Sequence, residues 1–201
     1  YQGLDRILEL TSWEYEVDLY SRIVEYSFPY CSVSSIGHEI MTESDLLNEI
    51  RCIIDSFLSN GADINAFGRS FHSTVDRTPL LEALHCRQSP KVIKYLLQQG
   101  ARADLVTSEG DTVLHLVIES YGDMQTIISL IKYGADVNRV ARRGSISPLI
   151  STAMCNLDHI AFYLLLHGAD ITCCDNEGRS YFHHLLVNPI ELCKSPHNEV
   201  K

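Results

Sequence analysis

The sequence predicts an all-α fold, a solenoid of stacked helix-turn-helix units joined by hairpin loops. A first marker, a glycine followed by alanine, recurs at spacings of 39, 34 and 34 residues: Gly61, Gly100, Gly134 and Gly168. A second marker, a threonine or serine that opens an apolar segment, follows each glycine after 12 to 17 residues: Thr78, Thr112, Ser147 and Ser180. Around these markers, apolar residues recur at helical spacing. An internal period near 34 residues is the signature of a repeat array.

The second marker begins the first helix of each unit. A threonine or serine side chain at this place can accept a hydrogen bond from an amide of the first helical turn. Pro79 and Pro148 come next, at a position where a missing amide donor costs nothing. Small or aliphatic residues then form a narrow face on which another helix can pack: Leu80, Ala83, Leu114, Leu149 and Ala153.

The second helix of each unit carries a broader apolar stripe, which the glycine of the first marker ends in a left-handed conformation. The stripe is formed in turn by Val92, Ile93, Leu96 and Leu97, by Ile127, Ile128, Leu130 and Ile131, and by Ile160, Tyr163, Leu164 and Leu165. We therefore expect helix pairs over about 44–60, 78–99, 112–133 and 147–167, and an incomplete pair after residue 180.

The residues that form the second marker make residues 44–189 resemble the ankyrin-repeat family. The four copies are Thr78-Pro-Leu-Leu81, Thr112-Val-Leu-His115, Ser147-Pro-Leu-Ile150 and Ser180-Tyr-Phe-His183. The resemblance implies about four recognisable L-shaped repeats, each with a hairpin finger, and degenerate repeats as terminal caps. Two departures stand out: the loop from Ile64 to Asp76 is about five residues longer than usual, and the last repeat has a short or missing second helix.

The two ends of the chain lack the Gly-Ala marker. In residues 1–43 a helical stripe (Trp13, Val17, Tyr20 and Val24) ends at Pro29, which predicts an N-terminal helical cap or degenerate repeat. A separate helical element is the alternative. Residues 190–201 are expected to be a tail or a partial cap. The chain begins at Tyr1 without methionine, so we expect it to be a piece of a longer protein.

Composition excludes several functions. The 201 residues carry a formal net charge of −10, whereas nucleic-acid binding requires a basic face. No apolar run reaches the roughly 18 residues that span a bilayer. The seven cysteines are odd in number and irregularly spaced, which predicts no disulfide framework and an intracellular location, cytoplasmic or nuclear. We expect a protein or peptide partner, with no nucleic acid, membrane or small-molecule substrate.

The sequence offers no catalytic motif. The G-x-S-x-G elbow and the glycine-rich phosphate loops are missing, and an open repeat array offers no closed pocket, so we expect no enzyme activity and no cofactor. Six residues near the C-terminus are potential zinc ligands: Cys173, Cys174, His183, His184, Cys193 and His197. Their spacing fits no paired knuckle. We favour packing over a metal, because Cys173 takes the place of a small buried alanine in the family.

Two further sets of residues receive a structural interpretation. In the resembling family, the histidine at the position of His115 and His183 bonds the backbone of a neighbouring repeat. Asn65 and Asn138 match a position that is hydroxylated in some family members, but we favour side-chain amides that brace the loop.

The resemblance also implies a concave binding surface formed by the fingers and the ends of the first helices. The residues carried over onto it are Arg77, His85, Ser108, Glu109, Asp111, Glu119, Arg142, Arg143, Met154, Asn176, Glu177 and Arg179. A second candidate is the aromatic N-terminal region, namely Trp13, Tyr15, Tyr20, Tyr26, Phe28 and Tyr30. These aromatic residues could equally close the core of the first repeat.

The function that follows is a protein-interaction scaffold, which binds a partner on the concave groove. The alternative is a regulatory or substrate-recognition domain of a larger enzyme, channel or ubiquitin-ligase component.

Overall fold

The structure is a computed structural model that describes residues 43–69, 76–120, 122–142 and 144–187. It divides into two compact units, residues 1–101 and 102–201, which are treated separately below. The predicted N-terminal cap, its aromatic cluster and the C-terminal tail lie outside the described residues. In the described parts of the chain, no helix combines the length and the apolar character needed to cross a lipid bilayer.

The first unit begins with a long helix, α2, over Glu43–Ser59. Its buried face is formed by Ile50, Ile54 and Phe57, which recur at helical spacing. The prediction of a helix pair over 44–60 is wrong, because this stripe continues through 17 residues without a glycine or proline to break it. A helix pair would need its other member before residue 43, outside the described residues.

The other helices of the first unit are α3, Pro79–His85, and α4, Pro90–Gln98. The Thr78 hydroxyl accepts a hydrogen bond from the Leu81 amide, so the predicted cap is confirmed. Helix α4 contacts both α2 and α3 and contributes four buried aliphatic residues: Val92, Ile93, Leu96 and Leu97.

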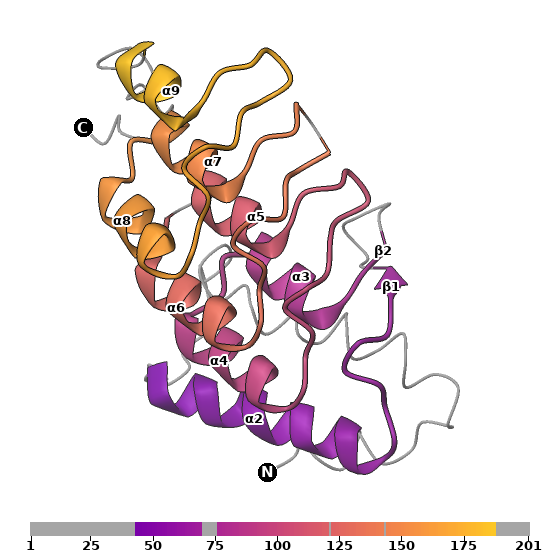
Figure 1. Cartoon of the computed structure of the whole chain (residues 1–201). Coiled ribbons are helices and arrows are strands. Elements are labelled where there is room, and N and C mark those ends of the chain that lie inside the picture. Colours follow the sequence, from indigo (N-terminus) through magenta and orange to yellow (C-terminus); the bar gives the residue numbers. More distant parts are fainter. Residues whose placement is uncertain (1–42, 70–75, 121, 143, 188–201) are drawn as a thin grey trace, which may run out of the picture. The chain divides into compact units, whose positions relative to one another are not determined.

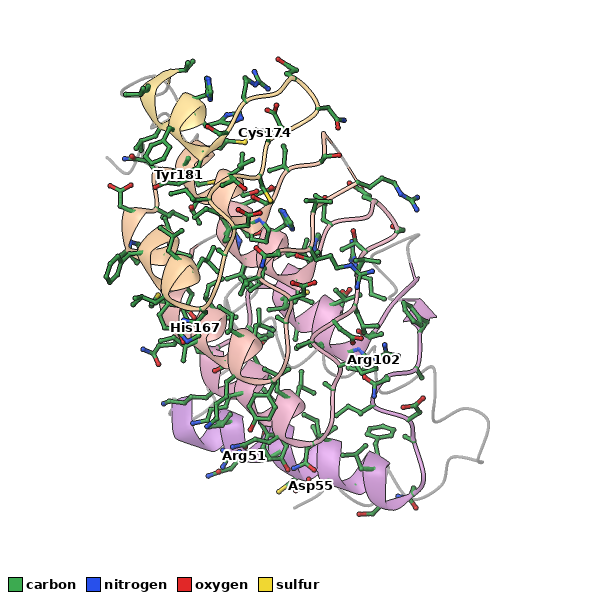
Figure 2. All side chains as sticks on the ribbon, viewed as in Figure 1. Arg51, Asp55, Arg102, His167, Cys174 and Tyr181 are labelled. Atoms are coloured by element: carbon green, nitrogen blue, oxygen red, sulfur yellow. The ribbon has the colours of Figure 1, made fainter. Side chains whose placement is uncertain are left out.

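A polar cluster also joins α2 to α4. The Tyr95 hydroxyl donates a hydrogen bond to Asp55, and the Arg51 guanidinium lies 4.9 Å from the centre of the Tyr95 ring. Figure 2 shows Arg51 and Asp55 together on α2. Burial, together with the bond to the Asp55 carboxylate, raises the pKa of Tyr95 to about 12. Tyr95 therefore stays neutral and holds the two helices together through its ring and its hydroxyl.

The long loop that precedes α3 forms a short antiparallel ladder. Strand β1, Gly68–Arg69, pairs with β2, Asp76–Arg77, with Gly68 opposite Arg77 and Arg69 opposite Asp76. The predicted extended finger is therefore a hairpin at its base. Its residues 70–75 lie outside the described residues.

The second unit contains five helices in its described residues: α5 Val113–Ser120, α6 Met124–Lys132, α7 Pro148–Met154, α8 Asp158–Leu166 and α9 Tyr181–Val187. Within this unit α7 contacts both α5 and α9, while α6 lies against α5 and α8 against α7 (Figure 1). The predicted pairs over 112–133 and 147–167 are confirmed, as is the first helix of the predicted incomplete pair after residue 180; residues 188–201 lie outside the described residues. Leu114 and Leu149 from the first helices, with Ile127 and Leu130 from α6, are fully buried.

The turns after the first helices use three residues with positive φ. Gly122 has a φ of 58°, and the corresponding residues after α3 and α7 are Arg87 at 53° and Asn156 at 56°. Glycine adopts this left-handed conformation without strain, whereas a side chain makes it unfavourable. The repeat geometry thus imposes the turn even where the local sequence does not favour it.

Candidate protein-binding surface

Three fingers precede the first helices of the second unit: residues 105–112, 139–147 and 173–180, hereafter the second, third and fourth fingers. The loops that carry them project to the same side of the unit (Figure 1). The Arg142 amide donates to the Gly110 carbonyl over 3.1 Å, and the Asn176 amide donates to the Gly144 carbonyl over 2.9 Å. The two bonds join residues at matching positions of successive fingers. The two hydrogen bonds therefore hold the three fingers in a row at a fixed spacing.

Gly110 allows this close approach. It has a φ of 89°, and a Cβ added to it would lie 2.4 Å from the Cβ of Arg142. Any side chain at this position would therefore displace the third finger from the second, so the glycine is a geometric requirement of the row.

The base of the third finger is anchored on a buried histidine. Nε2 of His115 lies 3.0 Å from the Ile146 carbonyl oxygen, and Nδ1 lies 2.8 Å from the Thr112 hydroxyl. Because a carbonyl only accepts, Nε2 carries the proton and Nδ1 accepts from the Thr112 hydroxyl. Burial lowers the pKa of His115, against the opposing influence of the Ile146 bond and of the Asp111 charge. The predicted backbone bond to the next repeat is confirmed.

The fourth finger is closed by the buried carboxylate of Asp175. Its Oδ1 accepts from the amides of Glu177 and Arg179, and its Oδ2 lies 2.9 Å from both Arg179 Nε and His184 Nε2. Burial raises the pKa of Asp175, but these hydrogen bonds outweigh it and hold the pKa well below its usual range. Arg179 is occupied by Asp175, and its Nη1 also lies 3.0 Å from Glu177.

The loops that follow the second helices are braced by asparagines, as predicted. Asn65 Nδ2 donates to the Gly100 carbonyl over 3.1 Å in the first unit. In the second unit, Asn138 Nδ2 donates to the Gly168 carbonyl over 2.9 Å, and its Oδ1 accepts from the Asp170 amide. The amides of both asparagines are thus used within the loops.

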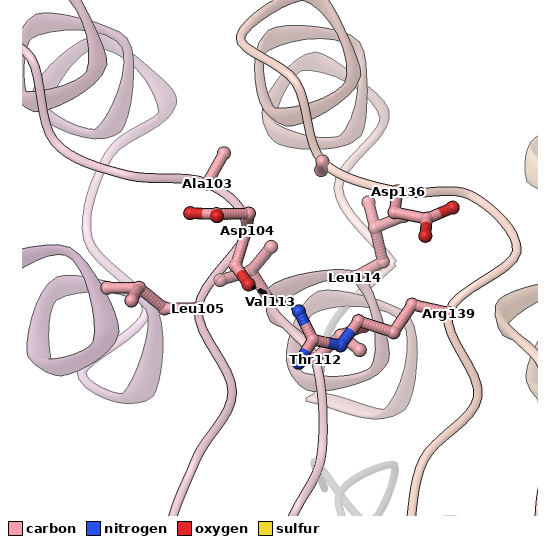
Figure 3. Close-up of a pocket in the computed structure, with 9 residues that line it drawn as sticks. Ala103, Asp104, Leu105, Thr112, Val113, Leu114, Asp136 and Arg139 are labelled. Carbon is pink, nitrogen blue, oxygen red and sulfur yellow. Dashed lines mark hydrogen bonds between the residues drawn. The ribbon is translucent and has the colours of Figure 1, made fainter.

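In the repeat between these two, Asp104 occupies the position of the asparagine, and its carboxylate cannot donate a hydrogen bond. Arg139 Nη1 instead donates to the Asp104 carbonyl over 2.8 Å (Figure 3). The two residues line a shallow depression with Ala103, Leu105, Thr112, Val113, Leu114, Ala135 and Asp136. The depression encloses no space for a water molecule, so we place no ligand there.

The predicted binding residues of the first unit are of two kinds. His85 is exposed at the end of α3. Arg77 is half-buried, and its Nη1 lies 3.0 Å from Oε2 of the buried Glu82. The Glu82 carboxylate also accepts a hydrogen bond from Cys86, and burial together with Glu82 raises the pKa of this thiol to about 11. Arg77 therefore anchors the first finger to α3 and is not freely available to a partner.

The structure places the predicted residues of the second unit on adjacent fingers and helix ends. Those exposed are Ser108, Glu109, Glu119, Arg142, Asn176, Glu177 and Arg179, and those half-buried are Asp111 and Met154. Arg143 lies outside the described residues. Glu119 on α5 accepts a 3.4 Å hydrogen bond from Ser151 on α7. Sequence reasoning missed Ser151, although a serine within an otherwise apolar first helix was a usable signal.

Helix α8 carries exposed apolar residues that the sequence analysis did not single out. Phe162 and Leu166 are exposed on α8, whereas the corresponding residues of α4 are Lys94 and Gln98. The signal was present, because α8 is apolar on every side after its first turn. This pair is a second candidate contact surface.

The potential zinc ligands are engaged separately. Cys173 is half-buried and donates to Asp170, and Cys174 donates to the Thr172 carbonyl. His184 bonds Asp175, as described above. Within the described residues, no group of three or more metal-ligating side chains is assembled. Cys193 and His197 lie outside them.

His183 differs from the prediction made for it. It is exposed, and its Nδ1 accepts from the Ser180 amide and lies 2.9 Å from the Ser180 hydroxyl. It therefore caps its own helix. The expected bond to a following repeat is not formed among the described residues.

The helix pairs, the fingers and the His115 bond define the class of protein. Residues 46–141 match the family model of ankyrin repeats, with three copies. Residues 46–141 of this chain are therefore ankyrin repeats. Ankyrin repeats generally mediate protein–protein interaction and are generally not enzymatic.

Three relatives show the range of proteins that contain similar repeats. The chain is 29% identical over 135 residues to phosphocholine transferase AnkX of Legionella pneumophila, covering 65% of this chain and 14% of that protein. It is 31% identical over 125 residues to SH3 and multiple ankyrin repeat domains protein 2 of Homo sapiens, covering 62% and 6%. It is 29% identical over 100 residues to the B-cell lymphoma 3 protein homolog of Mus musculus, covering 48% and 22%. The chain thus spans less than a quarter of each relative.

Proposed function

We propose that this chain binds another protein or a peptide through its fingers and the ends of its first helices. The observation that carries the proposal is the row of fingers in the second unit. Backbone hydrogen bonds hold the fingers at fixed spacing, and exposed side chains of alternating charge occupy successive fingers: Glu109, Arg142 and Glu177. A rigid row of this kind loses little conformational entropy on binding.

The alternating charges favour a particular kind of partner. A protein surface or peptide can carry charges in the complementary order, whereas a uniformly charged polymer would be repelled at every second finger. Glu119, at the end of α5, adds a carboxylate on the first helices. The proposed site therefore selects its partner by charge order along the row.

A regulatory or substrate-recognition role within a larger protein is the second candidate. The similarity to phosphocholine transferase AnkX, of which the chain spans 14%, supports it. In this case the fingers would recruit a substrate or a regulator, and catalysis would belong to other residues. We also propose an intracellular location, since the five described cysteines are free thiols.

The test starts from a binding partner identified by cross-linking to the purified chain, and measures its affinity by calorimetry. Reversing the charge at Arg142 and Arg143 to glutamate should weaken binding by about 2–5 kcal/mol if the arginines meet partner carboxylates in a desolvated contact. Folding should be unaffected, because surface changes usually alter stability by no more than about 0.5 kcal/mol.

Lys94→Glu is the matched control, because Lys94 is an exposed cation on the second helix α4 and not on a finger. Its affinity should equal that of the natural chain. Loss of binding in Lys94→Glu with full binding in the arginine variant would place the site on the second helices. Full binding in both variants would contradict the finger site.

A further inference from the structure

The third finger differs from its neighbours in length and in conformation. The cap Ser147 stands three positions after Gly144, whereas Thr112 stands two positions after Gly110. The extra residue is accommodated by two consecutive positive φ angles, 68° at Gly144 and 54° at Ser145. The Ala141 amide donates to the Ile146 carbonyl over 2.8 Å and closes the loop, so Ser145 belongs to a hairpin tip.

The side chain of Ser145 has no structural task in the described part of the molecule. It is partly exposed, and no described residue forms a hydrogen bond with its hydroxyl. Other hydroxyls near the finger bases are occupied: Thr78 and Ser147 cap helices, and Thr112 bonds His115. Ser145 is thus an available nucleophile on a projecting loop.

The sequence before Ser145 is basic: Arg142 and Arg143 stand three and two residues ahead of it. Arg142 is exposed, and guanidinium groups bind carboxylates in a bidentate, strongly oriented manner. An enzyme whose substrate groove presents carboxylates can therefore use Arg142 to place the hydroxyl of Ser145. Ser108, an exposed serine on the second finger, has no arginine among its four preceding residues.

We propose that Ser145 is a phosphorylation site for an arginine-directed serine/threonine protein kinase. The kinase transfers the γ-phosphoryl group of Mg-ATP to Oγ of Ser145. The new O–P bond forms as the bond between the γ-phosphorus and the β–γ bridging oxygen breaks, the hydroxyl proton passes to a carboxylate of the kinase, and ADP leaves.

Only the tip of the third finger has to open for Ser145 to reach a kinase groove, while the base stays anchored through the bond between Ile146 and His115. Two hydrogen bonds join its tip to the neighbouring fingers, from Arg142 to Gly110 and from Asn176 to Gly144. Segments with few buried contacts open locally far below the free energy of global unfolding. The phosphorylated residue therefore need not be released by unfolding of the repeat.

The modification would also change the proposed binding surface, an effect that rests on the proposed function. A phosphoserine carries a charge of about −1.5 to −2 at neutral pH and pairs well with arginine. At Ser145 it would compete with partner carboxylates for Arg142 and add negative charge next to the fourth finger, whose Asn176 amide bonds the Gly144 carbonyl. Phosphorylation should weaken binding of a partner that uses carboxylates at the third finger.

The test incubates the folded 201-residue chain with Mg-ATP and the catalytic subunit of cyclic-AMP-dependent protein kinase, and maps the phosphate by mass spectrometry. We expect one phosphate on Ser145, which Ser145→Ala abolishes. Arg142→Ala should lower kcat/KM roughly tenfold or more, as expected for loss of one charge-assisted hydrogen bond. Ser108→Ala, the matched control, should be phosphorylated at the natural rate.

Equal incorporation in Ser145→Ala would overturn the proposal. So would a folded chain that stays unmodified while a peptide of residues 138–149 is phosphorylated, since the hydroxyl would then be inaccessible in the native finger. Because no binding partner enters this assay, its result is independent of the proposed binding function.

Discussion

Helices α5 and α9 occupy equivalent positions in two repeats of the second unit, yet their apolar residues have different surroundings. Leu114 and Ile118 of α5 are 0% and 2% exposed, whereas the equivalent Phe182 and Leu186 of α9 are 53% and 77% exposed. Helix α7 packs against α5 on one side and α9 on the other, and no described helix follows α9. Sequence position alone does not bury a residue in this fold. Burial requires the next repeat.

The largest expected effect comes from truncating one member of such an equivalent pair. Leu114→Ala should lower the free energy of unfolding by about 2–5 kcal/mol, because it removes a fully buried side chain. Leu186→Ala should change it by no more than about 0.5 kcal/mol. Denaturant unfolding of both variants measures the difference. Equal midpoints would show that the two helices do not differ in packing.

The histidines at equivalent positions sharpen the comparison. His115→Ala removes the side-chain bond to the Ile146 carbonyl, which keeps only the Ala141 amide, and leaves the proton of the buried Thr112 hydroxyl without its acceptor, which should cost about 1–3 kcal/mol. His183→Ala removes only a local cap contact with Ser180 and should cost less. A larger loss at His183, measured by thermal unfolding, would contradict the assignment of His115 as the inter-repeat anchor.

The pH dependence of stability should identify the same histidine. Burial lowers the folded-state pKa of His115 below its ordinary value of 6.5. Between these two pKa values the unfolded chain binds one proton more than the folded chain. The contribution of His115 to the free energy of unfolding is therefore fully present above about pH 6.5 and is lost as the pH falls to the folded-state pKa. His115→Gln should therefore lose less stability between pH 7.5 and 5.5 than the natural chain. Denaturant unfolding of both chains at the two pH values measures the difference, and an equal loss in both would contradict the assignment.

The smallest expected effect concerns the strained turns after the first helices. Arg87→Gly should stabilise the chain by up to about 1 kcal/mol, because Arg87 has a φ of 53° that glycine adopts freely. Gly122→Ala should be destabilising, since its φ is 58° and the new Cβ would lie 2.8 Å from Cδ1 of Leu157. Calorimetric melting temperatures check both signs. Destabilisation by Arg87→Gly would mean that the arginine side chain contributes more than its backbone strain costs.

Much of the fold was predictable because residues at the helix ends identify the boundaries of each repeat. The caps at Thr78 and Ser147 and the Gly-Ala pairs mark where helices begin and end, and the structure follows them. The helix pair over 44–60 was wrong because a repeat spacing was extended onto α2, where no residue breaks the apolar stripe. The absence of a glycine or proline within α2 is visible in the sequence and should have outweighed the repeat spacing in the prediction.

The candidate site was predictable in position and less so in chemistry. The fingers lie where the markers placed them, but the pairing of Arg77 with Glu82 and of Arg179 with Asp175 depends on how each finger folds back onto its helix. The same holds for Glu119, which meets Ser151 of the next first helix across a sequence separation of 32 residues. Contacts between repeats depend on how the repeats stack, so the spacing of residues within one repeat does not predict them.

The central claim is that partners bind on the fingers of the second unit and the ends of its first helices. Hydrogen–deuterium exchange, measured with and without an identified partner, tests it most directly. We expect slower exchange in peptides from residues 105–112, 139–147 and 173–180, with α6 and α8 unchanged. Slower exchange confined to α8, around the exposed Phe162 and Leu166, with unchanged fingers would contradict the claim.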